Sequence, residues 1–192
     1  MSVQSLTQSG DALATLVAEM RRATTESSDP RTILKRVTPA ARRMALDKSW
    51  VRPEFYRGDG EQPNISTLLH EDPDHSLAVY AVAWLPGRGV PPHDHQTWAI
   101  VVGVDGPETN VFWERTDDRS QPGRCALKET YRRTFGIGEA VAFLPDDIHS
   151  VQNNSTEISL ALHVYGKNLN HVIRHRFDPV TGEIKPFTIK VR

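Results

Sequence analysis

Apolar residues in the first fifty positions recur three and four residues apart, the spacing of helices with one buried face. Two such stripes are present, and residues 27–30 with their Ser-Ser-Asp-Pro sequence separate them. The first stripe consists of Leu13, Leu16, Val17 and Met20, and the second begins with Ile33, Leu34 and Val37. We therefore predict amphipathic helices that pack on another layer of the protein.

A further helix boundary is predicted at Thr38 and Pro39. Threonine is a favoured N-cap and proline is favoured at the first helical position, whereas proline inside a helix removes a backbone hydrogen bond. We expect a third helix to begin there and to run through Met44 and Leu46. Residues 1–50 are thus predicted to form a layer of about three helices.

From about residue 64 the pattern changes to short β-branched and aromatic runs separated by proline, glycine and aspartate, which is typical of an all-β sandwich or barrel. A C-terminal hairpin is predicted, with strands at 173–177 and 184–191 and a turn at 178–182. No repeat or linker divides the chain. We expect one domain over residues 1–192, with the barrel and hairpin in residues 64–192.

Apolar and more polar residues alternate along residues 158–165, and the polar face carries a histidine and a tyrosine. Its apolar positions are Ile158, Leu160, Leu162 and Val164, and the other face carries Ser159, Ala161, His163 and Tyr165. A barrel wall explains this pattern if the predicted helices cover its apolar outside and its polar interior is functional. The alternative is an exposed polar face on which His163 and Tyr165 are ordinary surface residues.

Three histidines are candidates for a metal site. His93 and His95 lie two residues apart on an extended segment, so their side chains point to the same side. His149 lies after a turn, at the start of another strand. In a barrel this strand can lie opposite the segment that carries His93 and His95. Three imidazoles suit iron, zinc, copper or nickel and leave coordination positions open, as a catalytic site requires. The alternative is a pair of solvated histidines on an edge strand.

Composition narrows the function classes. The net charge is −1, with 23 basic and 24 acidic residues, so neither disorder nor a nucleic-acid partner is expected. Cys125 is the single cysteine, which excludes an internal disulfide framework and predicts a cytoplasmic location. No run reaches the roughly 18 apolar residues of a membrane span, so no membrane partner is expected. The oligomeric state stays open.

Four stretches follow one another in the order of a known set of motifs. They are Leu-Leu-His-Glu-Asp-Pro at 68–73, Pro-His-Asp-His-Gln-Thr-Trp at 92–98, Pro-Asp-Asp-Ile-His-Ser-Val-Gln-Asn at 145–153 and Leu-His-Val-Tyr-Gly at 162–166. Together they resemble the thiol dioxygenases of the cupin superfamily, the cysteine dioxygenase type I group, and especially its bacterial 3-mercaptopropionate dioxygenase branch. The resemblance implies a mainly β cupin fold, the double-stranded β-helix or jelly-roll barrel.

The resemblance also implies an iron(II) cofactor bound by the three histidines. A usual cupin has a carboxylate ligand four residues after the second histidine, and this chain has Ala99 there. The absence of that ligand fits the three-histidine iron site of thiol dioxygenases. The implied reaction oxidises a small thiol with O2 to its sulfinate, the thiol binding as thiolate.

Other roles are expected outside the ligand set. By resemblance, Tyr165 and His163 are catalytic groups around the metal, and Arg174 binds a substrate carboxylate. Trp98 follows His95 closely enough to line the substrate pocket. For Arg174 the alternative is a surface arginine in the basic cluster at residues 174–176.

The chain departs from the family at three places. Ala161 replaces a serine, so the hydrogen-bond relay to His163 is shortened or uses Ser159 or a water. Residues 97–101 contain no cysteine that could cross-link to the tyrosine. Ser66 stands near the position of the arginine that binds the substrate in animal-type enzymes, which argues against cysteine as the substrate and for a mercapto-carboxylate such as 3-mercaptopropionate.

Two alternative functions stay open. One is another metal-dependent cupin enzyme, an isomerase or other oxygenase, and the other is a non-catalytic metal- or ligand-binding cupin.

Overall fold

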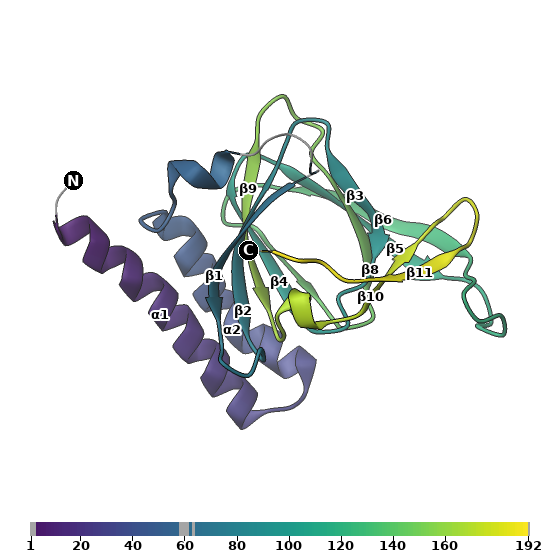
Figure 1. Cartoon of the computed structure of the whole chain (residues 1–192), viewed down its shortest axis with the longest axis horizontal. Helices are drawn as coiled ribbons and strands as arrows, with labels where there is room; N and C mark the ends of the chain where they lie inside the picture. Colours follow the sequence, from purple (N-terminus) through teal and green to yellow (C-terminus); the bar gives the residue numbers. More distant parts are fainter. Residues whose placement is uncertain (1–2, 58–61, 63, 192) are drawn as a thin grey trace.

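Two α-helices are followed by two antiparallel β-sheets in the part of the chain that the computed structural model describes, residues 3–57, 62 and 64–191 (Figure 1). The helices are α1 (Val3–Glu26) and α2 (Pro30–Asp47), and a short 3-10 turn (Pro53–Tyr56) follows them. The strands are β1 (Asn64–Glu71), β2 (Ala78–Trp84), β3 (Gly89–His93), β4 (Ala99–Asp105), β5 (Glu108–Arg115), β6 (Leu127–Phe135), β7 (Ala140–Phe143), β8 (Ile148–Gln152), β9 (Ser159–Tyr165), β10 (Arg174–Phe177) and β11 (Ile184–Phe187).

Strands β2 to β9 have the order of a jelly roll. One sheet contains β2, β9, β4 and β7 as neighbours, and the other contains β3, β8, β5 and β6. Every neighbouring pair is antiparallel, as in two nested Greek keys. Strand β1 extends the first sheet, and the hairpin β10–β11 extends the second. The prediction of a mainly β jelly roll with a C-terminal hairpin is confirmed.

Strand β9 separates two apolar clusters. Leu160, Leu162 and Val164 pack in the cluster that includes the buried faces of the helices. Ala161 and Tyr165 belong instead to the cluster between the two sheets. Because successive strand residues point to opposite faces, the inverted pattern of this strand is the pattern of a wall with helices outside and polar groups inside. That prediction is confirmed.

The helices cover the outer face of the first sheet (Figure 1). Helix α2 begins at an N-cap, Asp29, whose Oδ2 accepts a hydrogen bond from the Thr32 backbone N–H at 2.9 Å. Leu16 and Met20 of α1 and Val37 of α2 are fully buried in the shared cluster. None of the described helices is long and apolar enough to cross a membrane.

The prediction of about three helices is wrong, because Pro39 lies inside α2. The apolar stripe of this helix stays in phase across the proline, from Val37 to Ala41 and Met44, and all three are buried. Burial of a continuous stripe outweighs the cost of about 3 kcal/mol for an interior proline. Thr38 does not cap a new helix, since its hydroxyl donates to the Leu34 carbonyl at 2.6 Å.

Replacing Pro39 with alanine is expected to raise the free energy of unfolding by about 1–3 kcal/mol. Alanine restores a backbone N–H that can donate to the Lys35 carbonyl one turn earlier. Urea denaturation followed by circular dichroism measures the change. The matched control is Arg43→Ala, an exposed position of the same helix, which should stay within about 0.5 kcal/mol. A lowered midpoint for Pro39→Ala would show that α2 depends on the rigidity of the proline.

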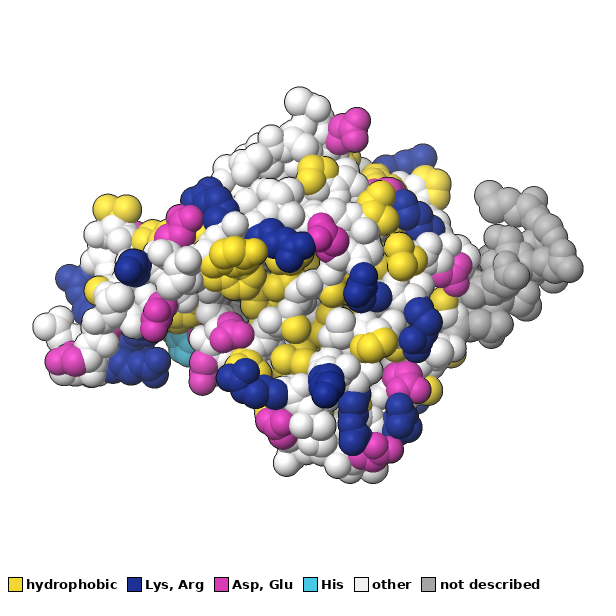
Figure 2. Space-filling model, turned by 180° about the vertical axis from the view of Figure 1, so that it is seen from behind, with side chains coloured by type: hydrophobic (Ala, Val, Ile, Leu, Met, Phe, Trp, Pro, Cys, Tyr) yellow, Lys and Arg dark blue, Asp and Glu magenta, His cyan; other side chains and the backbone are white. Residues whose placement is uncertain are grey.

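The surface carries charges of both signs. On the face seen in Figure 2, lysine and arginine side chains lie among aspartate and glutamate side chains. Exposed ion pairs such as Arg132–Glu129, at 2.9 Å, are part of this mixture. This face of the described chain therefore has no large area of positive charge. Nucleic-acid-binding proteins typically have such an area.

Candidate metal centre

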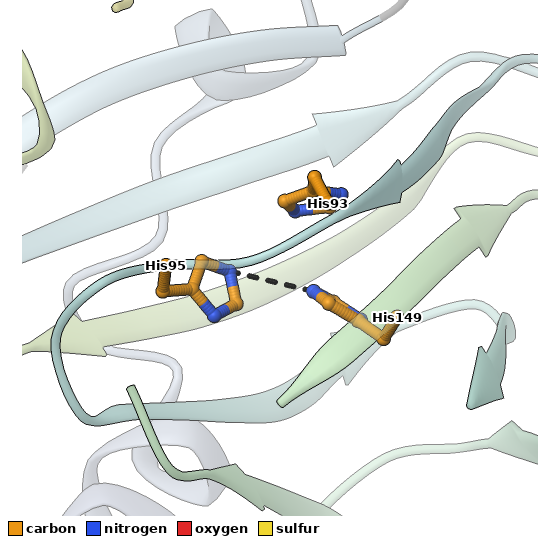
Figure 3. Close-up of side chains that lie close together, drawn as sticks. All are labelled: His93, His95 and His149. Atoms are coloured by element: carbon orange, nitrogen blue, oxygen red, sulfur yellow. Dashed lines mark hydrogen bonds between the residues drawn. The ribbon is translucent and has the colours of Figure 1, made fainter. Parts of the chain in front are cut away.

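The register of β3 and β8 brings the three candidate histidines together. His93 ends β3 and lies directly opposite His149 of β8, and His95 lies in the loop after β3. Their side chains point toward one another from these segments (Figure 3). All three are buried, with 7%, 2% and 2% of His93, His95 and His149 exposed. They form one cluster in the interior of the barrel.

The distances within the cluster suit one shared ion. One nitrogen from each ring lies within 4.8 Å of the other two. The Nε2 atoms of His95 and His149 are 3.4 Å apart (Figure 3). Two nitrogen ligands at about 2.1 Å from an ion, with a tetrahedral angle between them, are separated by about 3.4 Å. The observed separation matches that of two ligands of one metal.

Outer hydrogen bonds orient two of the rings. The Nδ1 atom of His93 lies 3.0 Å from the Pro91 carbonyl oxygen, and that of His149 lies 2.7 Å from Oδ1 of Asn110. Because these oxygens only accept, each Nδ1 donates and each Nε2 keeps its lone pair. The Nδ1 of His95 is buried and has no hydrogen-bond partner within the described residues. These lone pairs are available to an ion at the centre of the cluster.

The electrostatic environment keeps the rings neutral. Burial, with a smaller contribution from nearby Arg174, lowers the pKa of His93 to about 3. Burial also lowers the pKa of His95 and of His149 well below the usual value of 6.5, with a smaller contribution from the neighbouring imidazoles. Neutral imidazole is the form that binds metals. The cluster therefore needs no deprotonation to accept an ion at neutral pH.

The ligand set defines a class of metal. In the described part of the chain no carboxylate belongs to this cluster, and Ala99, four residues after His95, is fully buried. Three imidazoles fit iron, zinc, copper or nickel, and they fit calcium and magnesium poorly. The buried cluster of His93, His95 and His149 thus fits a divalent transition metal, without a choice among them.

Asp94, between two of these histidines, points away from the cluster. Its Oδ1 accepts a hydrogen bond from the backbone N–H of His175 at 2.8 Å, and its Oδ2 lies 2.9 Å from the ring Nδ1 of the same residue. The Gln96 amide donates to Oδ2 at 2.8 Å. The buried carboxylate therefore ties the loop that carries His95 to strand β10.

A cavity of about 570 Å³ opens onto the three histidines. Its volume lies in the range of about 300–1,000 Å³ that is usual for small-molecule sites. Besides the histidine cluster, the wall includes Ser66, Tyr80, His163, Tyr165 and Phe187, together with the cations Arg174, Arg176 and Lys190. The cavity is therefore large enough for a small organic substrate beside the histidine cluster.

Arg174 presents a buried cation to this cavity. Only 5% of the residue is exposed, so the interpretation as a surface arginine does not hold. Its Cζ atom lies 4.5 Å from the centre of the Phe187 ring, and it forms no ion pair with the acidic groups of the described residues. Burial lowers its pKa, yet a guanidinium stays charged in proteins. A buried cation without a counter-ion is suited to bind an anion.

His163 and Tyr165 form a buried pair on the cavity wall. The His163 Nδ1 and the Tyr165 hydroxyl oxygen are 2.8 Å apart. Burial lowers the pKa of His163 to about 3 and raises the pKa of Tyr165, so the ring is neutral and the phenol is protonated. The Nε2 of His163 is buried and has no partner in the described structure. Since an unpaired buried N–H is rarer than an unpaired acceptor, the favoured tautomer donates from Nδ1. The Tyr165 O–H is then free to donate into the cavity.

Neither Ala161 nor Ser159 supplies the expected relay to His163. Ala161 has no polar side chain, and the Ser159 hydroxyl is buried without a hydrogen-bond partner among the described residues. The pair of His163 and Tyr165 is thus shorter by one member than the relay that the resemblance implies.

Trp98 lies on the other side of the first sheet. It is buried in the cluster between that sheet and the helices, whereas its neighbour Ala99 belongs to the cluster inside the barrel. Successive residues of an extended segment face opposite sides, so Ala99, which points into the barrel, directs residue 98 outward. Trp98 is not among the residues that line the cavity, and the geometry does not support a contact with substrate.

Two polar residues near the histidines escaped the sequence analysis. Glu108 and Asn110 of β5 are 4% and 0% exposed, and Asn110 contacts His149. A signal was present, because a glutamate and an asparagine two residues apart in a strand that leads into Val111 and Phe112 are unusual. Their partner could not be identified without the pairing of β5 with β8.

No family model matches the chain. Similar solved structures include the cupin domain of an XRE family transcriptional regulator from Enterobacter cloacae, with 18% identity over 54% of this chain and 96% of that one, at a TM-score of 0.39. Another is the DMSP lyase DddQ from Ruegeria pomeroyi, with 18% identity over 62% of this chain and 53% of that one, at a TM-score of 0.44. A third is recombinant oxalate oxidase in complex with glycolate, with 18% identity over 58% of this chain and 55% of that one, at a TM-score of 0.44.

The chain spans about half the length of the lyase and of the oxidase. At these identities the likeness concerns the fold and carries no assignment of metal, substrate or reaction. The jelly roll itself follows from the strand order of this chain, and the chain is similar to proteins with cupin domains.

Proposed function

We propose that this protein is an iron(II)-dependent thiol dioxygenase that oxidises a small mercapto-carboxylate, such as 3-mercaptopropionate, with O2 to its sulfinate. The observation that carries the proposal is a combination in one cavity. A buried three-histidine cluster without a carboxylate ligand shares the cavity with the unpaired cation Arg174 and with the Tyr165–His163 pair. The motifs that resemble thiol dioxygenases contain the same histidines and tyrosine.

The histidine cluster determines which chemistry the site favours. Iron(II) held by three imidazoles would leave positions for a thiol and for O2, and would deprotonate the thiol. Because His93, His95 and His149 are neutral, the ligand set adds no negative charge that would repel an anionic thiolate. A substrate that binds as an anion through sulfur therefore suits this cluster.

Arg174 supports a carboxylate on the substrate. It lies on β10, which pairs with β3 through Arg176 and His93, so its guanidinium shares a cavity wall with a metal ligand. A planar guanidinium can donate two parallel hydrogen bonds to a carboxylate. Ser66, near the position where the resemblance places the arginine of animal-type enzymes, also lines the cavity and offers no charge. A thiol with one carboxylate is the substrate that these groups match.

The experiment is oxygen consumption by protein loaded anaerobically with iron(II). The panel is 3-mercaptopropionate, mercaptosuccinate, cysteine and cysteamine. Addition of both atoms of one O2 to one thiol gives one sulfinic acid, so O2 uptake and sulfinate formation are expected in equal amounts with 3-mercaptopropionate. Uptake without sulfinate, or no uptake by protein that holds iron, would contradict the proposal. The latter result would favour another class of metal-dependent enzyme or a binding role.

Tyr165→Phe is expected to retain the metal and to slow turnover by about 10- to 100-fold. The variant keeps the ring in its packing but removes the O–H that points toward the cavity. Initial rates of O2 uptake and the iron content of the purified variant measure the two effects. Tyr131→Phe is the control, because this exposed tyrosine lies outside the cavity lining. Wild-type turnover in Tyr165→Phe would exclude a catalytic role for its hydroxyl.

A further inference from the structure

We infer that Glu108, acting through Asn110, is a positioning residue that keeps the metal-binding nitrogen of His149 free of its proton. The inference concerns the three-histidine metal centre and does not depend on thiol oxidation. It rests on a chain of two hydrogen bonds that begins at a buried carboxylate and ends at a ligand ring.

Strands β5 and β8 place the three residues together. Asn110 Oδ1 lies 2.7 Å from His149 Nδ1, and Asn110 Nδ2 donates to Oε1 of Glu108 at 2.8 Å. Glu108 and Asn110 are two residues apart on β5, so they face the same side. In the antiparallel pairing with β8, Phe112 lies opposite His149 and Asn110 lies opposite Val151. The exposed fractions of Glu108, Asn110 and His149 are 4%, 0% and 2%.

The direction of each hydrogen bond follows from the carboxylate. Oε1 of Glu108 accepts from Asn110 Nδ2 when the group is ionised and also when it carries a proton on Oε2, so the amide of Asn110 turns its NH2 group toward Glu108. Its oxygen then faces His149 and accepts from Nδ1–H. A neutral imidazole with its proton on Nδ1 has a lone pair on Nε2, the atom that faces His95. Glu108 thereby selects the tautomer that can bind a metal.

The opposite orientation of the amide would disable the ligand. Asn110 would then donate from Nδ2 to Nδ1 of His149, and the proton of the neutral ring would move to Nε2. An Nε2–H cannot coordinate an ion. The reversed amide would also place its oxygen against Oε1 of Glu108, where two acceptors repel. The carboxylate is thus the group that distinguishes the two orientations.

A purely structural role does not explain a glutamate at this position. Burial raises the pKa of Glu108 to about 7, although the hydrogen bond from Asn110 opposes that rise. A carboxyl group in such surroundings is costly to ionise, and an apolar residue would fill the space without that cost. The contact that the carboxyl group makes with Asn110 is therefore the reason to retain it.

Glu108→Gln is the first test, because glutamine keeps the shape but can either donate or accept. Nitrogen-15 NMR of the metal-free protein reports the tautomer of His149, whose signals are identified by their absence in His149→Gln. We expect the Nδ1–H tautomer in the wild type and a mixture in Glu108→Gln. Anaerobic titration with iron(II) against a chromophoric chelator should show affinity lower by about 10- to 100-fold in the variant.

The double variant Glu108→Gln/Asn110→Asp separates positioning from packing. It moves the carboxylate two positions along β5, so that the introduced aspartate accepts from both His149 and the introduced glutamine. We expect it to restore the Nδ1–H tautomer and most of the iron(II) affinity. Ser159→Ala is the matched control: it removes another buried polar group of the barrel that makes no contact with His149, and it should leave both readouts unchanged.

Three results would overturn the inference. One is an Nε2–H tautomer of His149 in the wild type, which can be observed even if Glu108→Gln does not fold. Another is wild-type iron(II) affinity and a single tautomer in Glu108→Gln. The third is a loss in Glu108→Gln that the double variant, folded to the same melting temperature, does not restore. Failure of thiol oxidation would leave these readouts unaffected, so the two proposals are tested separately.

Discussion

His149→Ala is expected to reduce bound iron(II) from about one ion per chain to near zero. The substitution removes one of three ligands, and two imidazoles on one side of a cavity hold an ion far less well than three. It also leaves the Asn110 amide oxygen without the ring that donates to it. Iron content after anaerobic reconstitution and desalting measures the result directly.

Two variants control this experiment. His149→Gln preserves more of the side-chain volume against Phe143, whose ring centre lies 4.0 Å from that of His149, and it should lose iron as well. His171→Ala removes a histidine from a separate, partly exposed cluster with Glu71 and His75, and it should retain the buried ion. Full iron stoichiometry in His149→Ala would exclude His149 as a ligand. Loss of iron in His171→Ala alone would move the metal site to the surface cluster.

Arg174→Met is expected to have opposite effects on activity and on stability. The kcat/KM for 3-mercaptopropionate should fall by about 10- to 150-fold, which corresponds to the roughly 1.5–3 kcal/mol of hydrogen bonds to a charged group. The free energy of unfolding should rise by about 1 kcal/mol, because a buried cation without a counter-ion is replaced by an apolar chain of similar length. Any oxidation of cysteamine, which has an ammonium group and no carboxylate, should not fall.

The measurements are steady-state O2 uptake with both thiols and urea denaturation of the iron-free protein. Arg176→Met is the matched control for stability, since Arg176 lies 4.5 Å from the same Phe187 ring but is exposed. Its unfolding free energy should change by less than about 0.5 kcal/mol. Equal losses with 3-mercaptopropionate and cysteamine in Arg174→Met would show that Arg174 does not recognise a carboxylate.

Local signals predicted an all-β sandwich or barrel and part of the candidate site, whereas the jelly roll was implied by the resemblance. The two-residue spacing of His93 and His95 predicted that both side chains point to the same side, since side chains two residues apart in an extended segment do so. The inverted alternation of residues 158–165 predicted helices outside and polar groups inside, and the burial of Leu162 and Tyr165 in separate clusters agrees. These signals are contained in neighbouring residues, so they can be interpreted without knowledge of the fold.

The wrong prediction at Thr38 and Pro39 has a different origin. The dipeptide has the local preferences of a helix start, and a local rule cannot include the burial of Val37, Ala41 and Met44 on one continuous face. Trp98 is similar: it is close to His95 along the chain, but it immediately precedes β4 and lies on the opposite side of the sheet from Ala99.

By itself, then, the sequence determined the class of fold, the direction of the short-range histidine pair and the two faces of β9, because each depends on periodicity within one element. Only the tertiary structure decided which distant groups meet. The registers of β3 with β8, of β8 with β5 and of β3 with β10 place His149 opposite His93, bring Asn110 within reach of His149, and bury Arg174 at the same cavity. Such registers arise from the packing of whole sheets, and no single segment of the chain encodes them.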